Sequence, residues 1–152
     1  MSDALARVKQ LAEGAQERYL ALETAASAGV VRWEWADFDL VSFRPAFFEI
    51  GRYARGKRLS AEPRPPVSGA VGYGFDEQGR IIVERHQVEF PGQYEDVFHV
   101  YEPGWITSLR YAYGADKRWM NVDGYRLGPH GVVEWAGVSS YDVSHYARSD
   151  EG

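Results

Sequence analysis

The sequence predicts an α+β protein, with an N-terminal helix packed on an antiparallel β-meander of about six to eight strands. Apolar residues recur at helical spacing up to residue 28, whereas a period of two dominates from residue 30 onward. Glycine- and proline-containing turns then recur as they do between strands joined by hairpins. A chain of 152 residues with 45% hydrophobic content can bury one core, so residues 1–152 are expected to form a single domain with a frayed tail at 148–152.

One helix is expected over residues 3–28. Seven apolar residues lie alternately three and four positions apart and therefore share one stripe: Leu5, Val8, Ala12, Ala15, Tyr19, Leu22 and Ala26. Ser2 or Asp3 can cap the first turn, and Gly29 stands where a C′ glycine is expected. Gly14 opposes the helix by about 1 kcal/mol relative to alanine. The stripe suits a helix that covers a sheet; a coiled-coil or partner helix is the alternative.

The body of the domain, residues 30–146, is expected to be β-rich. Residues 30–38 alternate as a strand whose tryptophans face one side. Residues 43–59 fit either a helix opened by Pro45 or a strand over 46–53. The strands that follow are expected to turn at 76–79, 91–92, 103–104, 115–117, 123–124 and 128–131.

Residues 73–80, with the sequence YGFDEQGR, resemble the YD repeat of Rhs-type proteins. In this pattern Asp76 caps a turn and Gly79 supplies a positive φ. Residues 111–118 and 125–133 are degraded copies without a fixed period, which excludes a full Rhs shell. Isolated hairpins of this kind also resemble parts of small bacterial immunity proteins of polymorphic-toxin systems. That resemblance implies a compact, acidic, cytoplasmic protein that binds another protein and lacks catalytic motifs.

Composition and motifs argue against several classes of function. The chain has no cysteine, so disulfides and thiolate metal sites are excluded, and its net charge of −5 makes nucleic acid an unlikely partner. It shows no apolar stretch of membrane-spanning length and no signal-peptide pattern, so a cytoplasmic location without a membrane partner is expected. No P-loop, GxGxxG, GxSxG, HExxH or EF-hand motif occurs, so no cofactor is expected and enzymatic activity is left open.

A row of polar side chains forms when the predicted hairpins are paired. Two-residue turns at 91–92 and 103–104 would bring five polar residues onto one face of three strands: Glu84, His86, His99, Ser108 and Arg110. Glu84 would face His99, and His99 would face Ser108. The row could serve acid/base or zinc chemistry, or be a solvent-facing strip of polar pairs. We expect no metal at this row. We also expect no catalytic triad, because flat neighbouring strands offer no oxyanion hole.

A second candidate is a partner-binding surface at the ends of one strand: Tyr94, Glu95, Asp96, Tyr101, Glu102 and Trp105. Residues 44–64 carry a net charge of +4, so the rest of the chain carries −9 and could attract a basic partner. Tyrosine and tryptophan would add contact area. In the alternative, the tyrosines belong to the core and only the acids are exposed.

Two interpretations from different classes follow. The first is a non-enzymatic protein-binding inhibitor, most simply an immunity protein that neutralises a basic toxin by occlusion. The second is a small-molecule-binding protein or enzyme with an aromatic pocket in a curved, helix-covered sheet, using Glu84, His86 and His99. They differ in whether the aromatic face encloses a cavity or is sealed by the N-terminal helix. A nucleic-acid role for residues 44–64 comes third.

Overall fold

A computed structural model describes residues 2–44, 47–139 and 143–147. The strands are β1 (Arg32–Ala36), β2 (Arg58–Leu59), β3 (Val71–Phe75), β4 (Ile81–Gln87), β5 (Tyr94–Glu102), β6 (Trp105–Tyr111), β7 (Trp119–Gly128), β8 (Gly131–Ser139) and β9 (Val143–Ala147). In the described ranges they form one nine-stranded sheet in the order β2-β1-β3-β4-β5-β6-β7-β8-β9, with antiparallel neighbours throughout. The α+β meander is confirmed, although the strands outnumber the expected six to eight. The predicted tail at 148–152 lies outside the described residues.

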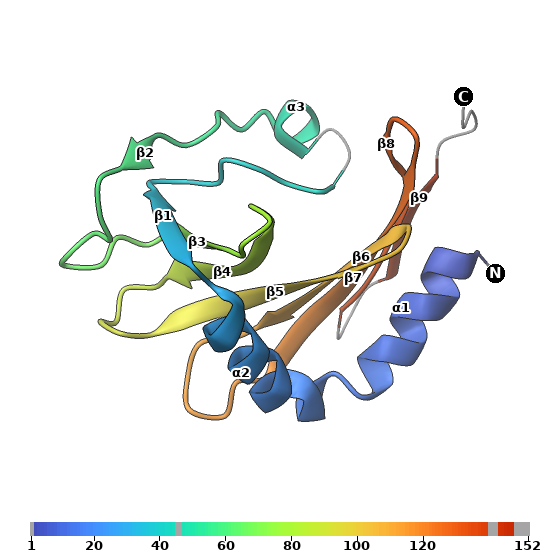
Figure 1. The fold of residues 1–152 in the computed structure, drawn as a ribbon, viewed down its shortest axis with the longest axis horizontal. Helices are drawn as coiled ribbons and strands as arrows, with labels where there is room; N and C mark the ends of the chain where they lie inside the picture. The colour runs from blue at the N-terminus through green and yellow to red at the C-terminus, as the bar shows by residue number, and fades with distance from the viewer. Residues whose placement is uncertain (1, 45–46, 140–142, 148–152) are drawn as a thin grey trace.

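Two helices replace the single helix expected over 3–28. They are α1 (Asp3–Glu13) and α2 (Tyr19–Gly29), separated by Gly14 and a 3-10 turn, η1 (Gln16–Arg18). Glycine weakens a helix interior, and the break lets each segment follow the sheet separately. Figure 1 shows both helices along one side of the sheet. Neither described helix is long and apolar enough to cross a membrane, nor is any other in the described ranges.

The helix ends are partly as expected. Ser2 caps α1, because its Oγ accepts a hydrogen bond from the Leu5 backbone N–H at 3.1 Å. Gly29 is the last residue of α2 rather than a C′ residue. A Cβ at Gly29 would lie 3.0 Å from Cδ1 of Ile82, so this glycine permits close contact between α2 and the sheet.

The side of the sheet covered by α1 and α2, here called the helix face, carries the main core. Its buried sheet residues are Val83, Phe98, Leu109, Tyr111, Val122 and Ala136, and every residue of the predicted stripe packs against them. The Tyr19 ring meets the rings of Phe98 and Tyr111 edge-on, with centroids 5.7 and 5.1 Å apart. The stripe therefore covers the sheet, as predicted.

The opposite side of the sheet, here called the pocket face, is covered by residues 37–44 and 47–57, together called the covering segment. These include the short helix α3 (Phe47–Gly51), so the helical alternative for 43–59 is correct in part; Pro45 itself lies outside the described residues. The Leu40 backbone N–H donates a hydrogen bond to the Tyr73 hydroxyl at 2.9 Å and ties this covering segment to β3. In Figure 1, α3 and its flanking segments lie across the sheet from α1 and α2.

The hairpin at 73–80 has the geometry predicted from its sequence. Oδ1 of Asp76 accepts hydrogen bonds from the backbone N–H groups of Gln78 at 3.0 Å and Arg80 at 2.9 Å. Gly79 has a φ of +78°, a conformation that favours glycine. These contacts define the turn between β3 and β4.

The predicted turn at 123–124 is wrong, because β7 continues through it. Gly124 lies on the helix face, where a Cβ would come within 2.7 Å of Cγ1 of Val8. Asp123 points to the pocket face and accepts a hydrogen bond from Nε1 of Trp135 at 3.0 Å. Gly124 therefore permits close contact with α1, and Asp123 contributes to the pocket face; neither residue reverses the chain. Beyond β7, strands β8 and β9 pair antiparallel and complete the sheet.

Candidate functional site

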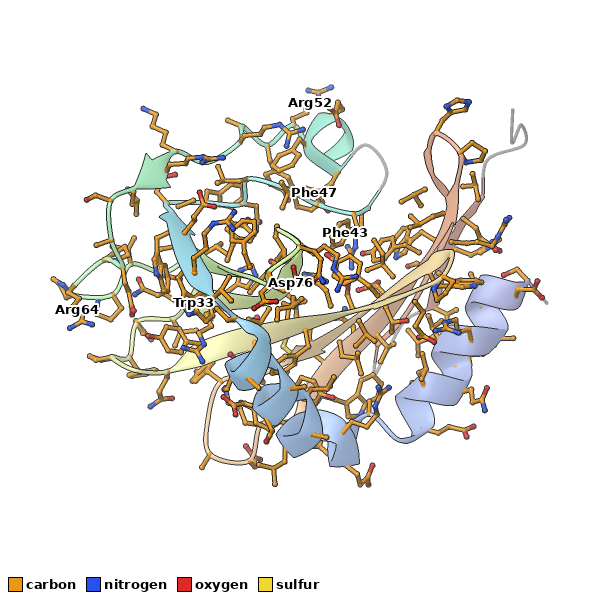
Figure 2. The ribbon with its side chains drawn as sticks, viewed as in Figure 1. Trp33, Phe43, Phe47, Arg52, Arg64 and Asp76 are labelled. Atoms are coloured by element: carbon orange, nitrogen blue, oxygen red, sulfur yellow. The ribbon has the colours of Figure 1, made fainter. Side chains whose placement is uncertain are left out.

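A cavity of about 370 Å³ lies on the pocket face between the sheet and the covering segment. The sheet contributes Glu84, Glu95, Val97, His99, Ser108, Arg110, Met120, Asn121, Asp123 and Tyr125, and the covering segment contributes Asp39, Val41, Ser42, Phe43, Arg44 and Phe47. Figure 2 shows Phe43 and Phe47 on this side of the sheet, away from α1 and α2. The volume is within the usual range for a small-molecule site.

A hydrogen-bonded relay crosses three strands at the floor of this cavity. Oε2 of Glu84 lies 2.5 Å from Nε2 of His99, and Nδ1 of His99 lies 2.6 Å from Oγ of Ser108. Because the ionised carboxylate can only accept, Nε2 carries a proton, and in the neutral imidazole Nδ1 then accepts from the serine hydroxyl. The His99 side chain is 3% exposed, so the relay is largely removed from water.

The relay contains three predicted residues, but the predicted register between β4 and β5 is wrong. Glu84 pairs with Val97 instead of His99, because residues 88–93 form a longer loop in place of a two-residue turn. The shift is by two residues, so Glu84 stays on the same face and reaches His99 diagonally. The register between β5 and β6 is as predicted, with His99 opposite Ser108.

Two further groups converge on Glu84. Oε1 of Glu84 lies 2.9 Å from Nε2 of His86, which neighbours it along the same face of β4. Asp39, from the covering segment, brings its carboxylate toward the pair; ligand atoms of the three side chains lie within 4.8 Å of one another. Among the described residues, no group donates a hydrogen bond to the Asp39 carboxylate and no cation forms an ion pair with it.

The two neighbouring carboxyl groups have opposite pKa shifts. Burial raises the pKa of Asp39 above its ordinary value of 3.8; attraction to His86 opposes this shift and the charge of Glu84 adds to it. Burial also raises the pKa of Glu84, but hydrogen bonds from His86 and His99 outweigh burial and leave this pKa well below 4.5. Glu84 therefore holds its negative charge firmly, whereas Asp39 ionises against the cost of burial.

The other charged groups of the cavity wall are paired. Nη1 of Arg110, a predicted site residue, lies 3.0 Å from Oε1 of Glu95. Asp123 accepts a hydrogen bond from Nδ2 of Asn121 at 2.6 Å and also lies 3.6 Å from Nη2 of Arg44. Burial raises the pKa of Tyr125 well above 10, which keeps its hydroxyl protonated.

The residues predicted to bind a partner do not form one patch. Successive side chains of β5 alternate between the two faces, so Tyr94 and Asp96 lie on the helix face and Glu95 on the pocket face. Each of the three acids has a cationic neighbour: Glu95 has Arg110, Asp96 has Lys117 and Glu102 has Arg7. The Tyr101 hydroxyl donates to the Ile81 carbonyl at 2.7 Å, and Trp105 lies beneath the Arg7 guanidinium.

A larger cavity of about 500 Å³ lies at the edge of the helix face, between α2 and the sheet. Its charged groups are already engaged. Asp96 accepts a hydrogen bond from the Tyr19 hydroxyl at 2.9 Å and pairs with Lys117 at 2.8 Å. Arg85 lies over the ring of Trp33, 4.7 Å from its centroid, and also over Tyr94. With its polar groups paired, this cavity has less to offer a ligand than the smaller one.

Sequence reasoning missed several residues of the pocket-face site. Asp39 follows the strand predicted over 30–38, and Phe43 lies in a segment whose conformation the sequence leaves ambiguous. Asp123 was assigned to a turn. No local pattern marks these residues, because the covering segment meets the sheet only in the folded chain.

Comparison with known proteins finds no matching family model, no matching curated protein and no matching solved structure. The chemistry of the site therefore has to be read from its residues. The relay has the order of a Glu-His-Ser triad, but Ser108 lies in the middle of a strand paired on both sides. Its backbone N–H groups belong to the sheet and form no oxyanion hole. The arrangement is suited to holding a ligand, with Ser108 oxygen as an acceptor.

Proposed function

We propose that the protein binds a small molecule in the pocket-face cavity and that the ligand is neutral or cationic and carries several hydrogen-bond donors. The observation that carries the proposal is the buried Glu84, held ionised by His86 and His99 at the floor of the cavity. A buried charged network contributes little stability compared with apolar residues of the same volume. Its presence beside an open cavity favours a role in binding.

The ligand class follows from the charges of the cavity wall. Four carboxylates face two guanidinium groups, so the wall is negative overall when the histidine is neutral. Asp39 and the Ser108 oxygen are acceptors that a ligand can use. Phe43 and Phe47 provide apolar surface on the covering side. A polyhydroxylated compound or an amine would satisfy these groups, whereas an anion would be repelled.

A binding screen with a matched pair of phenylalanine variants tests the proposal. Polyols, monosaccharides and small amines would be screened by thermal shift and the positives measured by calorimetry. Phe43→Ala is expected to weaken binding at least tenfold, or by about 1.4 kcal/mol. Phe90→Ala removes a half-exposed ring that lies tilted against Tyr113, outside the cavity lining, and is expected to leave affinity unchanged. Equal affinity in the two variants would contradict a pocket-face site.

The protein-inhibitor interpretation stays a prediction of the sequence. It is supported by the charge of −9 outside residues 44–64 and by the exposed Glu102 next to Trp105 at the turn between β5 and β6. If a basic toxin is the partner, charge reversal at Glu102 should lower the association rate. Trp105→Ala should raise the dissociation rate about tenfold. A partner that responds to neither variant would contradict this interpretation.

A further inference from the structure

Asp39 and Glu84 line the pocket-face cavity, and His86 lies beside them, with ligand atoms of the three side chains within 4.8 Å of one another. We propose that these three side chains bind one divalent transition-metal ion, and that the ion takes part in holding the ligand. This inference rests on the proposed function, because it places the metal in the same site. It departs from the expectation, based on the sequence, that the protein holds no metal.

The geometry of the three groups fits a metal ion after a small adjustment. Nε2 of His86 and Oε1 of Glu84 are 2.9 Å apart, and the Asp39 carboxylate completes a group within 4.8 Å. Two ligands bound at about 2.1 Å lie at most about 4.2 Å apart. Rotation of the Asp39 side chain can close the difference, since no hydrogen bond from the described residues restrains its carboxylate.

Glu84 is already oriented for such a role. Its Oε2 is held by Nε2 of His99, which is itself held by Ser108, so Oε1 is directed at His86. Partners of this kind typically fix the ligands of metal sites. The metal would replace the proton now lying between Oε1 and Nε2, and that proton would leave to solvent or move to Nδ1 of His86.

The donor set indicates which ions fit. One imidazole nitrogen with two carboxylates suits zinc, cobalt, manganese or ferrous iron better than magnesium or calcium, which prefer oxygen alone. Three protein ligands leave at least one coordination position for an oxygen or nitrogen of the ligand. The ion would also offset the repulsion between the Asp39 and Glu84 carboxylates.

Cobalt(II) and zinc(II) binding to chelator-treated protein tests the inference. Cobalt absorption and zinc calorimetry should each show one equivalent bound, with magnesium and calcium at least tenfold weaker. Asp39→Asn and His86→Ala should each weaken binding at least tenfold. His145→Ala is the matched control, because Nε2 of His145 also lies 2.8 Å from a glutamate oxygen, that of Glu134, outside the three-residue cluster. Its metal affinity should equal that of the unchanged protein.

The inference is overturned if the unchanged protein binds neither metal, or if Asp39→Asn and His86→Ala bind as tightly as His145→Ala. His86→Gln, which keeps a polar side chain, replaces His86→Ala if circular dichroism shows that the latter does not fold. If the protein binds a small molecule in a manner that depends on Phe43 but binds no metal, the metal site is overturned and the proposed function stands. Metal binding that depends on Asp39 and His86, with no ligand affected by Phe43→Ala, would remove the proposed function and keep the metal site.

Discussion

The two faces of strands β4 to β6 are built from alternating residues of the same segments, yet they have opposite character. Val83, Phe98 and Leu109 on the helix face are buried and apolar, whereas their neighbours along the chain include Glu84, His99 and Ser108. Each large apolar side chain that is fully buried contributes about 1.5–3 kcal/mol to folding. A buried ion pair contributes little or nothing. The helix face therefore carries most of the stability, which leaves the pocket face free for a polar site.

The segments that cover the two faces also differ in their structure. The helix face is covered by α1 and α2, which have eleven residues each. The pocket face is covered by a mostly irregular segment whose helix α3 has five residues. The cavity lies under this covering segment, and the main core lies on the other side of the sheet.

The largest expected effect is on the helix face. Leu109 is 1% exposed, so Leu109→Ala should lower the free energy of unfolding by about 2–5 kcal/mol, measured by urea denaturation. Ser108→Ala, on the other face one residue away, removes a hydrogen bond to His99 and should cost about 1–2 kcal/mol. A larger loss for Ser108→Ala would reverse the assignment of stability to the helix face.

The next effect concerns the contact between α1 and β7. Gly124→Ala would place a Cβ 2.7 Å from Cγ1 of Val8, and such overpacking should cost about 1–3 kcal/mol of unfolding free energy. Gly14→Ala is the control, because its Cβ would meet nothing within 4 Å. If thermal unfolding shows no difference between the two variants, α1 does not pack closely on β7.

On the pocket face, Glu84→Gln should flatten the acid dependence of stability. The pKa of Glu84 is lowered in the folded state, so its carboxylate stabilises the fold fully above its unfolded pKa near 4.5. This contribution is lost as the pH falls toward the lower, folded pKa. Unfolding free energies measured across this range in chelator should fall less steeply for Glu84→Gln. An unchanged slope would mean that His86 and His99 do not stabilise the charge.

The smallest expected effect has the opposite sign. The pKa of Asp39 is raised in the folded state, so its ionisation lowers the free energy of unfolding. This loss is complete above the folded pKa and disappears below the unfolded pKa of about 3.8. Asp39→Asn should therefore raise the melting temperature at neutral pH in chelator and leave it unchanged in acid. A lower melting temperature at neutral pH would show that the Asp39 carboxylate has a stabilising partner in the fold and is not available to a ligand.

The part of the site that lies on the strands could be predicted from the sequence, whereas the part that lies on the loops could not. Local pattern was sufficient to place Glu84, His99 and Ser108 on one face, because alternation along strands survives a register error of two residues. The loop at 88–93 could not be foreseen, since Pro91-Gly92 is an equally good two-residue turn by local rules. Asp39 came from a segment with no periodicity, so its position over His86 had no signal in the sequence.

Sequence pattern alone was sufficient to predict the α+β class, the apolar stripe of the N-terminal helices and the Asp76 turn. Each depends on contacts within a few residues or on a short repeating period. Three features could not be predicted from the sequence and appear only in the folded chain. Gly14 ends a helix, Asp123 and Gly124 lie inside β7, and the covering segment forms a cavity with the sheet. The physical reason is that these features depend on contacts between distant segments, such as Val8 against Gly124 and Phe43 against His99. Such contacts exist only once the sheet has formed and its two faces are occupied.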